Sequence, residues 1–207
     1  GMPAAPTGLT LGEALRSRQV LLQGFATLLQ AAVGGAFVIH MGPILVWSGI
    51  GAASAAGFAG LVGFASIFGK LISGWLTDRT TSGLLPFSAY AGPALAYLLI
   101  WQSHGSPAMI TAAVLISGYS NGALAQLTAY LLTRYAGLAH FGKIFGLIAA
   151  MMSLGAGFGP YFAGRLYDQT HSYELLLLAG MPIALIAGLS VAFLGPYPVF
   201  AKPQASA

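Results

Sequence analysis

Apolar residues fall into six long blocks along the chain, and polar residues gather in the short segments between them. Each block comes close to the roughly 20 residues that an α-helix needs to cross a bilayer. Ten-residue strands of alternating polarity, the pattern of membrane β-barrels, are absent from the sequence. Only helices and closed barrels satisfy their backbone in lipid, so we predict an all-α membrane protein. The six predicted spans cover residues 20–40, 51–77, 84–101, 108–132, 144–164 and 175–195.

The segments outside the spans are short. Residues 1–19 are expected to form a linker and a short interfacial helix, which Thr10 would cap and Glu13 would complete as a capping box. A short loop containing Pro43 is expected after the first span. Residues 196–207 form the predicted tail, whose last seven residues, AKPQASA, are too polar and too few to fold.

The composition supports an integral membrane protein. Hydrophobic residues make up 57% of the 207 residues and charged residues only 6%, whereas soluble domains carry about 25% charged residues. The mean hydropathy is +0.81. The chain has no cysteine, which excludes thiol chemistry. Its net charge of +4 is explained by membrane orientation better than by nucleic-acid binding.

The basic residues indicate an orientation. Six spans place both termini on the same side of the membrane, and all basic residues but Arg165 fall on that side. By the positive-inside rule both termini are expected in the cytoplasm. The residues on that side are Arg16, Arg18, Lys70, Arg79, Arg134, Lys143 and Lys202.

One spacing, G-x4-G-x3-D, occurs once in each half of the chain. The first copy is Gly69, Gly74 and Asp78, and the second copy is Gly159, Gly164 and Asp168, at an offset of 90 residues. Three predicted helices separate the copies, so the two halves would have opposite topology. This arrangement predicts a three-plus-three inverted repeat, a plan that secondary transporters use.

The segment around the first copy, GKLISGWLTDRTTSG, resembles the loop signature G-x3-D-R-x-G-R-R of the major facilitator superfamily. Gly74, Asp78 and Arg79 match that signature, whereas its two later basic positions hold Ser82 and Gly83. Two stretches, RYAGLAHFGKIFGL and the later SLGAGFGPYFAGRLYDQTHSY, are similar to the second half of proteins of the monocarboxylate and oxalate/formate branch. The residues of the first stretch that carry this similarity are Arg134, Tyr135, Gly137, Phe141, Gly142 and Gly146. The resemblance extends from about Thr10 to Pro196.

This resemblance carries expectations about function. Members of the superfamily have two six-helix domains, and this chain resembles the second. The resemblance implies alternating-access transport of a small organic anion, with a monocarboxylate as one candidate, by a symporter or antiporter of the cell membrane. The expected partners are the lipid bilayer, the anion, and a missing N-terminal half or a second chain. No cofactor, metal or nucleic acid is implied.

Lys70 is the expected substrate-binding cation. It lies seven residues before the predicted end of its span, roughly 10 Å deep at 1.5 Å per residue. A cation at that depth is a functional candidate, and the alternative is a lysine that snorkels to the interface. The resemblance supports the first reading, because monocarboxylate transporters carry a substrate-binding arginine four residues before the glycine that matches Gly74. Their aspartate eleven residues earlier is Ala59 here, so their proton-coupling scheme does not carry over.

Asp78 and Arg79 are expected to form a cytoplasmic gate, with a solvated turn as the alternative. In such a gate the carboxylate would accept hydrogen bonds from a neighbouring helix N-terminus. Gln30 and Asn121 are expected to line the pathway, whereas other polar residues of the spans could equally form interhelical hydrogen bonds. These others are Gln23, Ser117, Tyr119, Ser120, Gln126, Thr128 and Tyr130.

The sequence GYSNG matches the nucleophile motif G-x-S-x-G around Ser120 and indicates a different class of function. The rival function is a six-span intramembrane serine protease, which needs a histidine at the depth of Ser120. All four histidines fall near span ends or in loops, and His40 could instead line the outer mouth of a pathway. A fragment that does not transport is a third reading.

Overall fold

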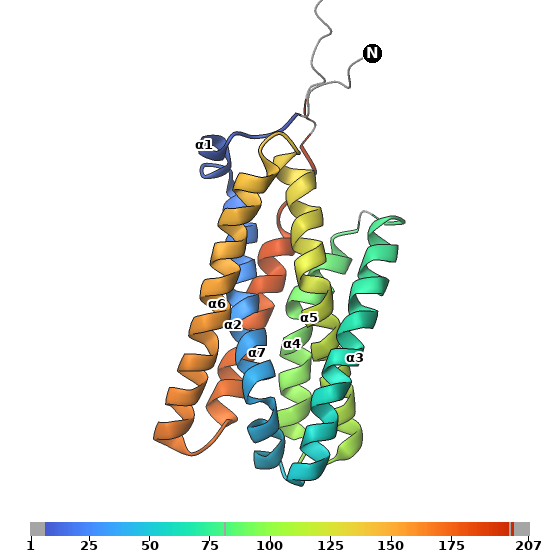
Figure 1. Ribbon diagram of the computed structural model, residues 1–207, viewed down its shortest axis with the longest axis vertical. Helices are drawn as coiled ribbons and strands as arrows, with labels where there is room; N and C mark the ends of the chain where they lie inside the picture. The colour runs from blue at the N-terminus through green and yellow to red at the C-terminus, as the bar shows by residue number, and fades with distance from the viewer. Residues whose placement is uncertain (1–6, 81, 199, 201–207) are drawn as a thin grey trace, which may run out of the picture.

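The computed structural model describes residues 7–80, 82–198 and 200, and in this part the regular elements are all α-helices (Figure 1). One short helix, α1 (Leu11–Ala14), precedes six long ones. Each of the six is long and apolar enough to cross a membrane, which confirms the predicted all-α architecture with six transmembrane helices. They are α2 (Arg18–Trp47), α3 (Ala52–Thr77), α4 (Leu84–Gln102), α5 (Pro107–Ala136), α6 (Phe141–Thr170) and α7 (Glu174–Ala192).

The helices extend beyond several of the predicted spans, most clearly in α2. Pro43 lies inside this helix, so the expectation of a loop at that position is wrong. Proline removes one backbone hydrogen bond, but transmembrane helices tolerate this loss where neighbouring groups satisfy the freed carbonyl. Proline also occurs inside three other spans, at Pro93, Pro160 and Pro182.

The six long helices stand side by side (Figure 1), and their contacts follow an inverted repeat. The most extensive contacts join α2 to α6 and α3 to α5, and α4 packs against α7. If α2, α3 and α4 are matched in order with α5, α6 and α7, the pair α2–α6 corresponds to the pair α5–α3. The pair α2–α7 likewise corresponds to α5–α4, which is also in contact. The two halves therefore pack through the same set of contacts, as a three-plus-three inverted repeat requires.

Glycines bring the two main helix pairs close together. A Cβ atom on Gly122 of α5 would collide with the backbone carbonyl of Ser66 on α3. A Cβ atom on Gly159 of α6 would collide in the same way with the carbonyl of Ala32 on α2. Small residues at such crossings allow backbone-to-backbone packing, which drives helix association in lipid.

We expect Gly122→Ala to destabilise the fold by about 1–3 kcal/mol, because the new methyl group overpacks a backbone contact. The free energy of unfolding of the reconstituted chain would be measured. Gly146→Ala is the matched control, since nothing lies within 4 Å of a Cβ atom built on Gly146. Equal stability of both variants would contradict the packing role of Gly122.

A chain of hydrogen bonds joins α2, α4 and α5 in the buried core. The Thr128 hydroxyl donates to the Leu124 carbonyl at 2.7 Å, so its oxygen accepts from the Tyr90 hydroxyl, also at 2.7 Å. The Tyr90 oxygen in turn accepts from Thr27 at 3.1 Å. Gln23 adds a bond from its Nε2 to the Thr128 carbonyl at 2.6 Å. These bonds give Gln23 and Thr128 an interhelical role.

Tyr90→Phe is expected to lower the free energy of unfolding by about 1 kcal/mol, because it removes two interhelical hydrogen bonds that average roughly 0.6 kcal/mol each in membranes. Unfolding titrations of the two proteins in the same bilayer mimetic would measure the difference. Tyr161→Phe is the control, because Tyr161 is 58% exposed. A loss of the same size in the control would argue against the hydrogen-bond chain.

The described parts of the N-terminal and C-terminal segments both attach to the end of α5. Leu9 N donates to the Ala136 carbonyl at 2.8 Å, and Tyr135 donates to the Gly195 carbonyl at 2.6 Å. We call this the terminal end of the bundle, and the end that carries the α6–α7 connection the far end. The predicted capping box of α1 is confirmed at the terminal end, since Thr10 and Glu13 bond each other reciprocally. The expected unstructured tail AKPQASA lies outside the described residues.

Candidate functional site

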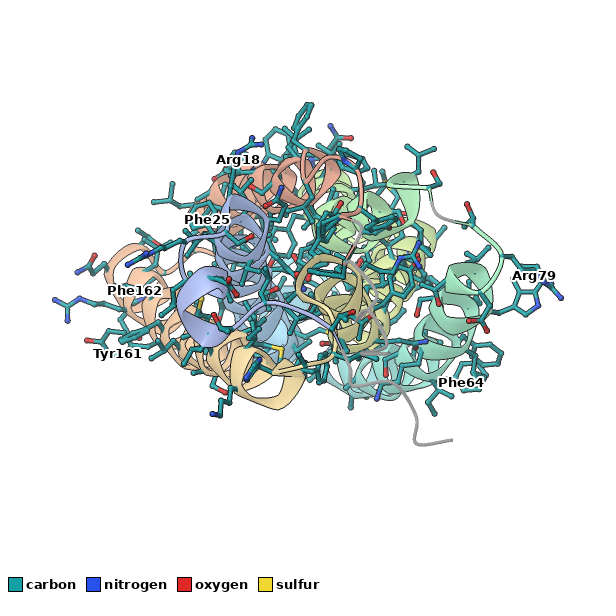
Figure 2. All side chains as sticks on the ribbon, turned by 90° about the horizontal axis from the view of Figure 1, so that it is seen from above. Arg18, Phe25, Phe64, Arg79, Tyr161 and Phe162 are labelled. Carbon is teal, nitrogen blue, oxygen red and sulfur yellow. The ribbon has the colours of Figure 1, made fainter. Side chains whose placement is uncertain are left out.

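Two helices expose most of their length. In the apolar 18-residue stretch of each helix, the buried share is only 22% for α3 and 17% for α6. The same share is 44–56% for α2, α4 and α5. Bulky side chains on these two helices, among them Phe64, Tyr161 and Phe162, lie on the outside of the bundle (Figure 2). A second exposed face of α3 carries small residues and Lys70.

On this second face, Ala56, Ala59, Gly63 and Lys70 are all exposed. Their spacings of three, four and seven residues place them along one side of the helix. We call this set the α3 stripe. Among the described residues, Lys70 is the charged side chain that lies farthest from a helix end, since α3 continues for seven residues beyond it to Thr77.

Lys70 and Asn121 lie at a similar height on adjacent helices. A Cβ atom on Gly69 would meet the backbone of Tyr119, and one on Gly122 would meet the backbone of Ser66. These two contacts fix the register of α3 against α5. Lys70 is the residue after the contact at Gly69, and Asn121 is the residue before the contact at Gly122. Both side chains are exposed. The structure therefore places these two predicted site residues at a common depth.

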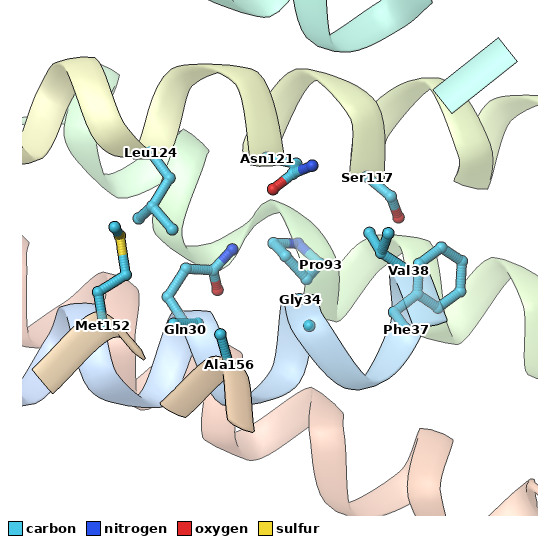
Figure 3. A pocket seen from close by; sticks show the side chains of 12 residues that line it. Gln30, Gly34, Phe37, Val38, Pro93, Ser117, Asn121, Leu124, Met152 and Ala156 are labelled. Atoms are coloured by element: carbon cyan, nitrogen blue, oxygen red, sulfur yellow. The ribbon is translucent and has the colours of Figure 1, made fainter. Parts of the chain in front are cut away.

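A cavity of about 200 Å³ contains the other predicted site residue, Gln30 (Figure 3). Gln30 comes from α2 and Asn121 from α5, and Pro93 of α4 and Ala156 of α6 complete the wall. The structure thus brings Gln30 and Asn121 together at one cavity. Lys70 is not among the residues that line this cavity.

Two buried acceptor atoms in this cavity have no partner. Gln30 is 2% exposed and its Oε1 makes no hydrogen bond, and Ser117 is 6% exposed with an unpaired Oγ. Buried polar atoms are rarely left unsatisfied, so each such atom calls for an explanation. A water molecule or a ligand group that donates a hydrogen bond could satisfy both. All the lining side chains are uncharged, so the cavity offers an occupant hydrogen bonds and apolar contact but no charge.

The motif residues Asp78 and Arg79 lie at the terminal end. Asp78 is the C-cap of α3 and is exposed, and the Arg79 guanidinium lies 3.9 Å from the centre of the Trp75 ring. Within the described part of the chain, no hydrogen bond reaches the Asp78 carboxylate. The expected bond to a helix N-terminus is therefore not made by a described residue. The matched Asp168 is exposed near the end of α6.

The motif glycines Gly74 and Gly164 have matched roles that the sequence did not reveal. A Cβ atom on Gly74 would meet the side-chain amide of Gln126 on α5. With its amide oriented to satisfy both groups, Gln126 donates to the Lys70 carbonyl at 2.8 Å and accepts from Gly74 N at 3.2 Å. At the far end, a Cβ atom on Gly164 would lie 3.5 Å from the ring of His40.

His40 repeats this contact on the other helix pair. Its Nε2 lies 3.1 Å from the carbonyl of Pro160, which is four residues before Gly164. Lys70 and Pro160 are themselves matched positions, at the same offset of 90 residues. Each motif glycine thus lets a polar side chain of the packed helix reach the carbonyl one turn earlier. Neither Gln126 nor His40 could be paired with its glycine from spacing alone.

The family stretch organises the terminal end rather than the cavity. The Arg134 guanidinium lies 4.5 Å from the centre of the Tyr197 ring, and Gly137 has a φ of 73°, a left-handed conformation that favours glycine. Phe141 begins α6 and stacks on Phe145 at 5.4 Å. Gly142 and Gly146 are exposed, at positions matching Ala52 and Ala56 of α3.

The geometry gives no support to a serine nucleophile. Ser120 is 0% exposed and its Oγ lies against Gly92. In the described part of the chain no histidine bonds Ser120, since His40 bonds Pro160 and Tyr173 instead. Residues 7–80, 82–198 and 200 also contain no group of three or more His, Cys, Asp or Glu that could hold a metal ion.

Comparison with known families now decides the class. The sequence pattern of the Major Facilitator Superfamily matches residues 20–207. The chain belongs to this superfamily. The resemblance inferred from the loop signature is confirmed, and the chain is a multi-pass membrane protein of a family of transporters.

Individual relatives share the same class. The chain is 29% identical over 180 residues to human Monocarboxylate transporter 11, an overlap that covers 80% of this chain and 37% of that protein. It is 29% identical over 144 residues to the Probable nitrate/nitrite transporter NarK2 of Mycobacterium tuberculosis, covering 65% and 33%. For human Monocarboxylate transporter 12 the identity is 25% over 144 residues, covering 68% and 28%. The chain therefore spans about a third of the length of these relatives.

Proposed function

We propose that this chain is the C-terminal six-helix half of a secondary transporter that moves a small organic anion by alternating access. The observation that carries the proposal is the exposed Lys70 in the interior of α3, level with Asn121. An intramembrane cation is costly unless it faces protein or a water-filled cavity. The small residues Ala56, Ala59 and Gly63 lie exposed on the same side of the helix, before Lys70 in the sequence.

The names of the relatives support an anion as the substrate. Monocarboxylate, nitrate and nitrite, which those names mention, are all small and carry a single negative charge. Lys70 would bind such a charge as a point cation rather than as a bidentate fork. A monocarboxylate is the candidate substrate, with Asn121 and Gln30 binding the rest of the molecule through their amides. The driving gradient is that of protons in a symporter or of a counter-substrate in an antiporter.

Lys70→Gln in the complete transporter is expected to reduce anion uptake at low substrate concentration by tenfold or more, because the variant lacks the point cation that would bind the anion. A tenfold loss corresponds to about 1.4 kcal/mol of binding free energy. Initial rates of uptake of a labelled monocarboxylate into proteoliposomes would be measured over a range of concentrations. Lys70→Arg keeps the charge and should retain most of the uptake. Lys143→Gln is the matched control at the start of α6, where the lysine is exposed.

Uptake with a normal KM in Lys70→Gln would overturn the role of this residue. That result, together with normal uptake in Asn121→Ala and Gln30→Ala, would favour the reading in which this chain is a partner or fragment that does not itself carry the anion within the complete assembly. Hydrolysis of a peptide substrate that is abolished by Ser120→Ala would instead favour the intramembrane protease.

A second half is needed to complete the site. The exposed faces of α3 and α6 lack a covering element within the described residues, and the Asp78 carboxylate finds no helix N-terminus there. We propose that an N-terminal six-helix half, or a second chain, covers both. Asp78 and Arg79 would then form a gate between the halves, and Gly69, Gly74, Gly164 and Asp168 would shape the matched helix ends.

If the halves are joined, an antibody raised against the segment 201–207 should detect a product about twice the 21.2 kDa of this chain in source membranes, because transporters of this plan consist of two six-helix halves. A band near 21.2 kDa would contradict the covalent arrangement and leave a separate partner chain as the second half. We further propose a location in the cell membrane with the terminal end in the cytoplasm, where Arg16, Arg18 and Arg134 lie.

A further inference from the structure

An apolar groove of about 420 Å³ lies between α6 and α7 on the outside of the bundle. These two helices follow each other in the chain but barely touch, because α6 packs on α2 while α7 packs on α4 and α2. The floor of the groove is therefore formed by α2, together with the ring of Tyr97 from α4. The small residues that keep this floor low are Ala32, Gly155, Gly159 and Gly180.

The groove offers no free hydrogen-bonding side chain. Every lining side chain is apolar except that of Tyr97, whose hydroxyl donates to the Val33 carbonyl. Among the described residues that line it, none carries an unpaired buried polar side-chain atom, in contrast to Gln30 and Ser117 at the other cavity. Apolar cavities stay dry and accept apolar molecules. The chemistry of the groove therefore selects hydrocarbon.

The groove has the length of one membrane leaflet. On α6 it extends from Leu154 to Leu166, which is roughly 18 Å at 1.5 Å per residue. Half of the hydrocarbon core of a bilayer measures about 15 Å. Leu154 lies near the middle of α6, and Leu166 lies four residues before its end at Thr170. The groove thus follows the leaflet at the far end, over the depth that an acyl chain occupies.

Arg165 stands at the headgroup end of the groove. It is exposed, and it follows Leu154, Phe158 and Phe162 by eleven, seven and three residues, which places all four along one side of α6. In the described part of the chain its guanidinium has no carboxylate partner. Arg165 is also the one lysine or arginine that the sequence places on the far side of the membrane. An apolar channel and a free cation therefore meet at a single edge of the bundle.

We propose that this groove is a phospholipid site in the leaflet at the far end, where one acyl chain lies between α6 and α7 and Arg165 binds the phosphate. A guanidinium binds phosphate through two parallel N–H···O bonds, whereas a lysine offers only a point charge. Arg165 lies five residues before the end of α6, roughly 8 Å along the helix, so its long side chain reaches the headgroup region. A glycerophospholipid satisfies the hydrocarbon groove and the cation together.

The groove lies on a different side of α6 from the surface proposed for the second half. The α6 residues that match the α3 stripe at the offset of 90 are Gly146, Ala149 and Ser153. At 3.6 residues per turn, Phe158 is rotated by about 140° from Ser153 around the helix. Figure 2 likewise shows Phe162 on the opposite side of the bundle from Phe64 of α3. Lipid binding in the groove is therefore independent of the proposed anion transport.

The test titrates this chain with palmitoyl-oleoyl phosphatidylglycerol and measures the Kd of the first bound lipid by native mass spectrometry. Arg165→Gln should raise this Kd by about fivefold or more, because the guanidinium–phosphate bonds are lost. Ala179→Phe places a ring at an exposed α7 position that lines the groove, and should raise the Kd by about tenfold or more. Diacylglycerol with the same chains lacks the phosphate and should bind the native chain as weakly as phosphatidylglycerol binds Arg165→Gln.

Two matched variants control for general effects of charge and bulk. Lys143→Gln removes an exposed cation near the start of α6, and Ala192→Phe adds the same ring at an exposed α7 position outside the groove. Both should keep the Kd within about twofold of the native value, as surface substitutions away from a site do. Glycerol phosphate should not displace the lipid, because it lacks the acyl chain.

An unchanged Kd in Arg165→Gln or in Ala179→Phe would overturn the proposal. Equal binding of diacylglycerol and phosphatidylglycerol would do so too, since the groove would then hold hydrocarbon without recognising phosphate. Losses of the same size in Lys143→Gln and Ala192→Phe would show non-specific lipid association instead. Arg165 is exposed, so Arg165→Gln decides even if Ala179→Phe does not fold.

The same titration of the complete transporter distinguishes a lipid from a helix of the second half as the occupant. Ala179→Phe should again weaken binding of the lipid there, because the groove faces the bilayer in the complete protein as well. A complete transporter in which Ala179→Phe binds the lipid like the native protein would mean that the second half fills the groove. That result would contradict the lipid site.

Discussion

Backbone contact at two helix crossings supports the whole structure. In lipid, helices gain little from hiding apolar side chains from one another, and their association depends on close packing and on interhelical hydrogen bonds. Gly122 and Gly159 provide that closeness, each placing its helix directly on the backbone of Ser66 or Ala32. The register set there determines which side chains of α3 meet α5, and which of α2 meet α6. The height of Lys70 relative to Asn121 follows from this register.

The polar residues of the spans divide into those whose bonds are complete and those whose bonds are not. Thr27, Tyr90 and Thr128 form a directional chain in which every hydroxyl hydrogen has an acceptor, the last being the Leu124 carbonyl. Gln30 and Ser117 instead present unpaired acceptors to a cavity. A completed chain specifies the packing of helices, whereas an incomplete set has the capacity to bind something. Gln23 and Ser120 also carry an unpaired buried atom, but neither lines this cavity, so the unpaired atom and the cavity together mark Gln30 and Ser117 as candidate binding residues.

The sequence predicted the class, the number of spans and the repeat, because each depends on a long-range pattern. Six apolar blocks and a single spacing repeated at 90 residues were enough for these. The loop at Pro43 was wrong because proline is read as a helix breaker in water, whereas a helix in lipid continues through it. The sequence also pointed to Gln30 and Asn121, but it could not show that they share a cavity while Lys70 stands apart. That separation depends on how four helices rotate about their axes, and the small residues that set those rotations give no strong periodic signal.

The repeat is most informative where its two copies differ. Gly74 and Gly164 both open one turn of helix to a polar side chain, so a common architecture precedes any specialisation of the halves. On this shared frame Lys70 is matched by Pro160, which places a cation on one side of the repeat and none on the other. Gln126 is matched in role by His40, so a helix carbonyl contacts an amide at the terminal end and an imidazole at the far end. A symmetric frame would serve both membrane faces equally. The substitutions that break its symmetry are therefore the residues at which the proposed transport cycle would acquire a direction.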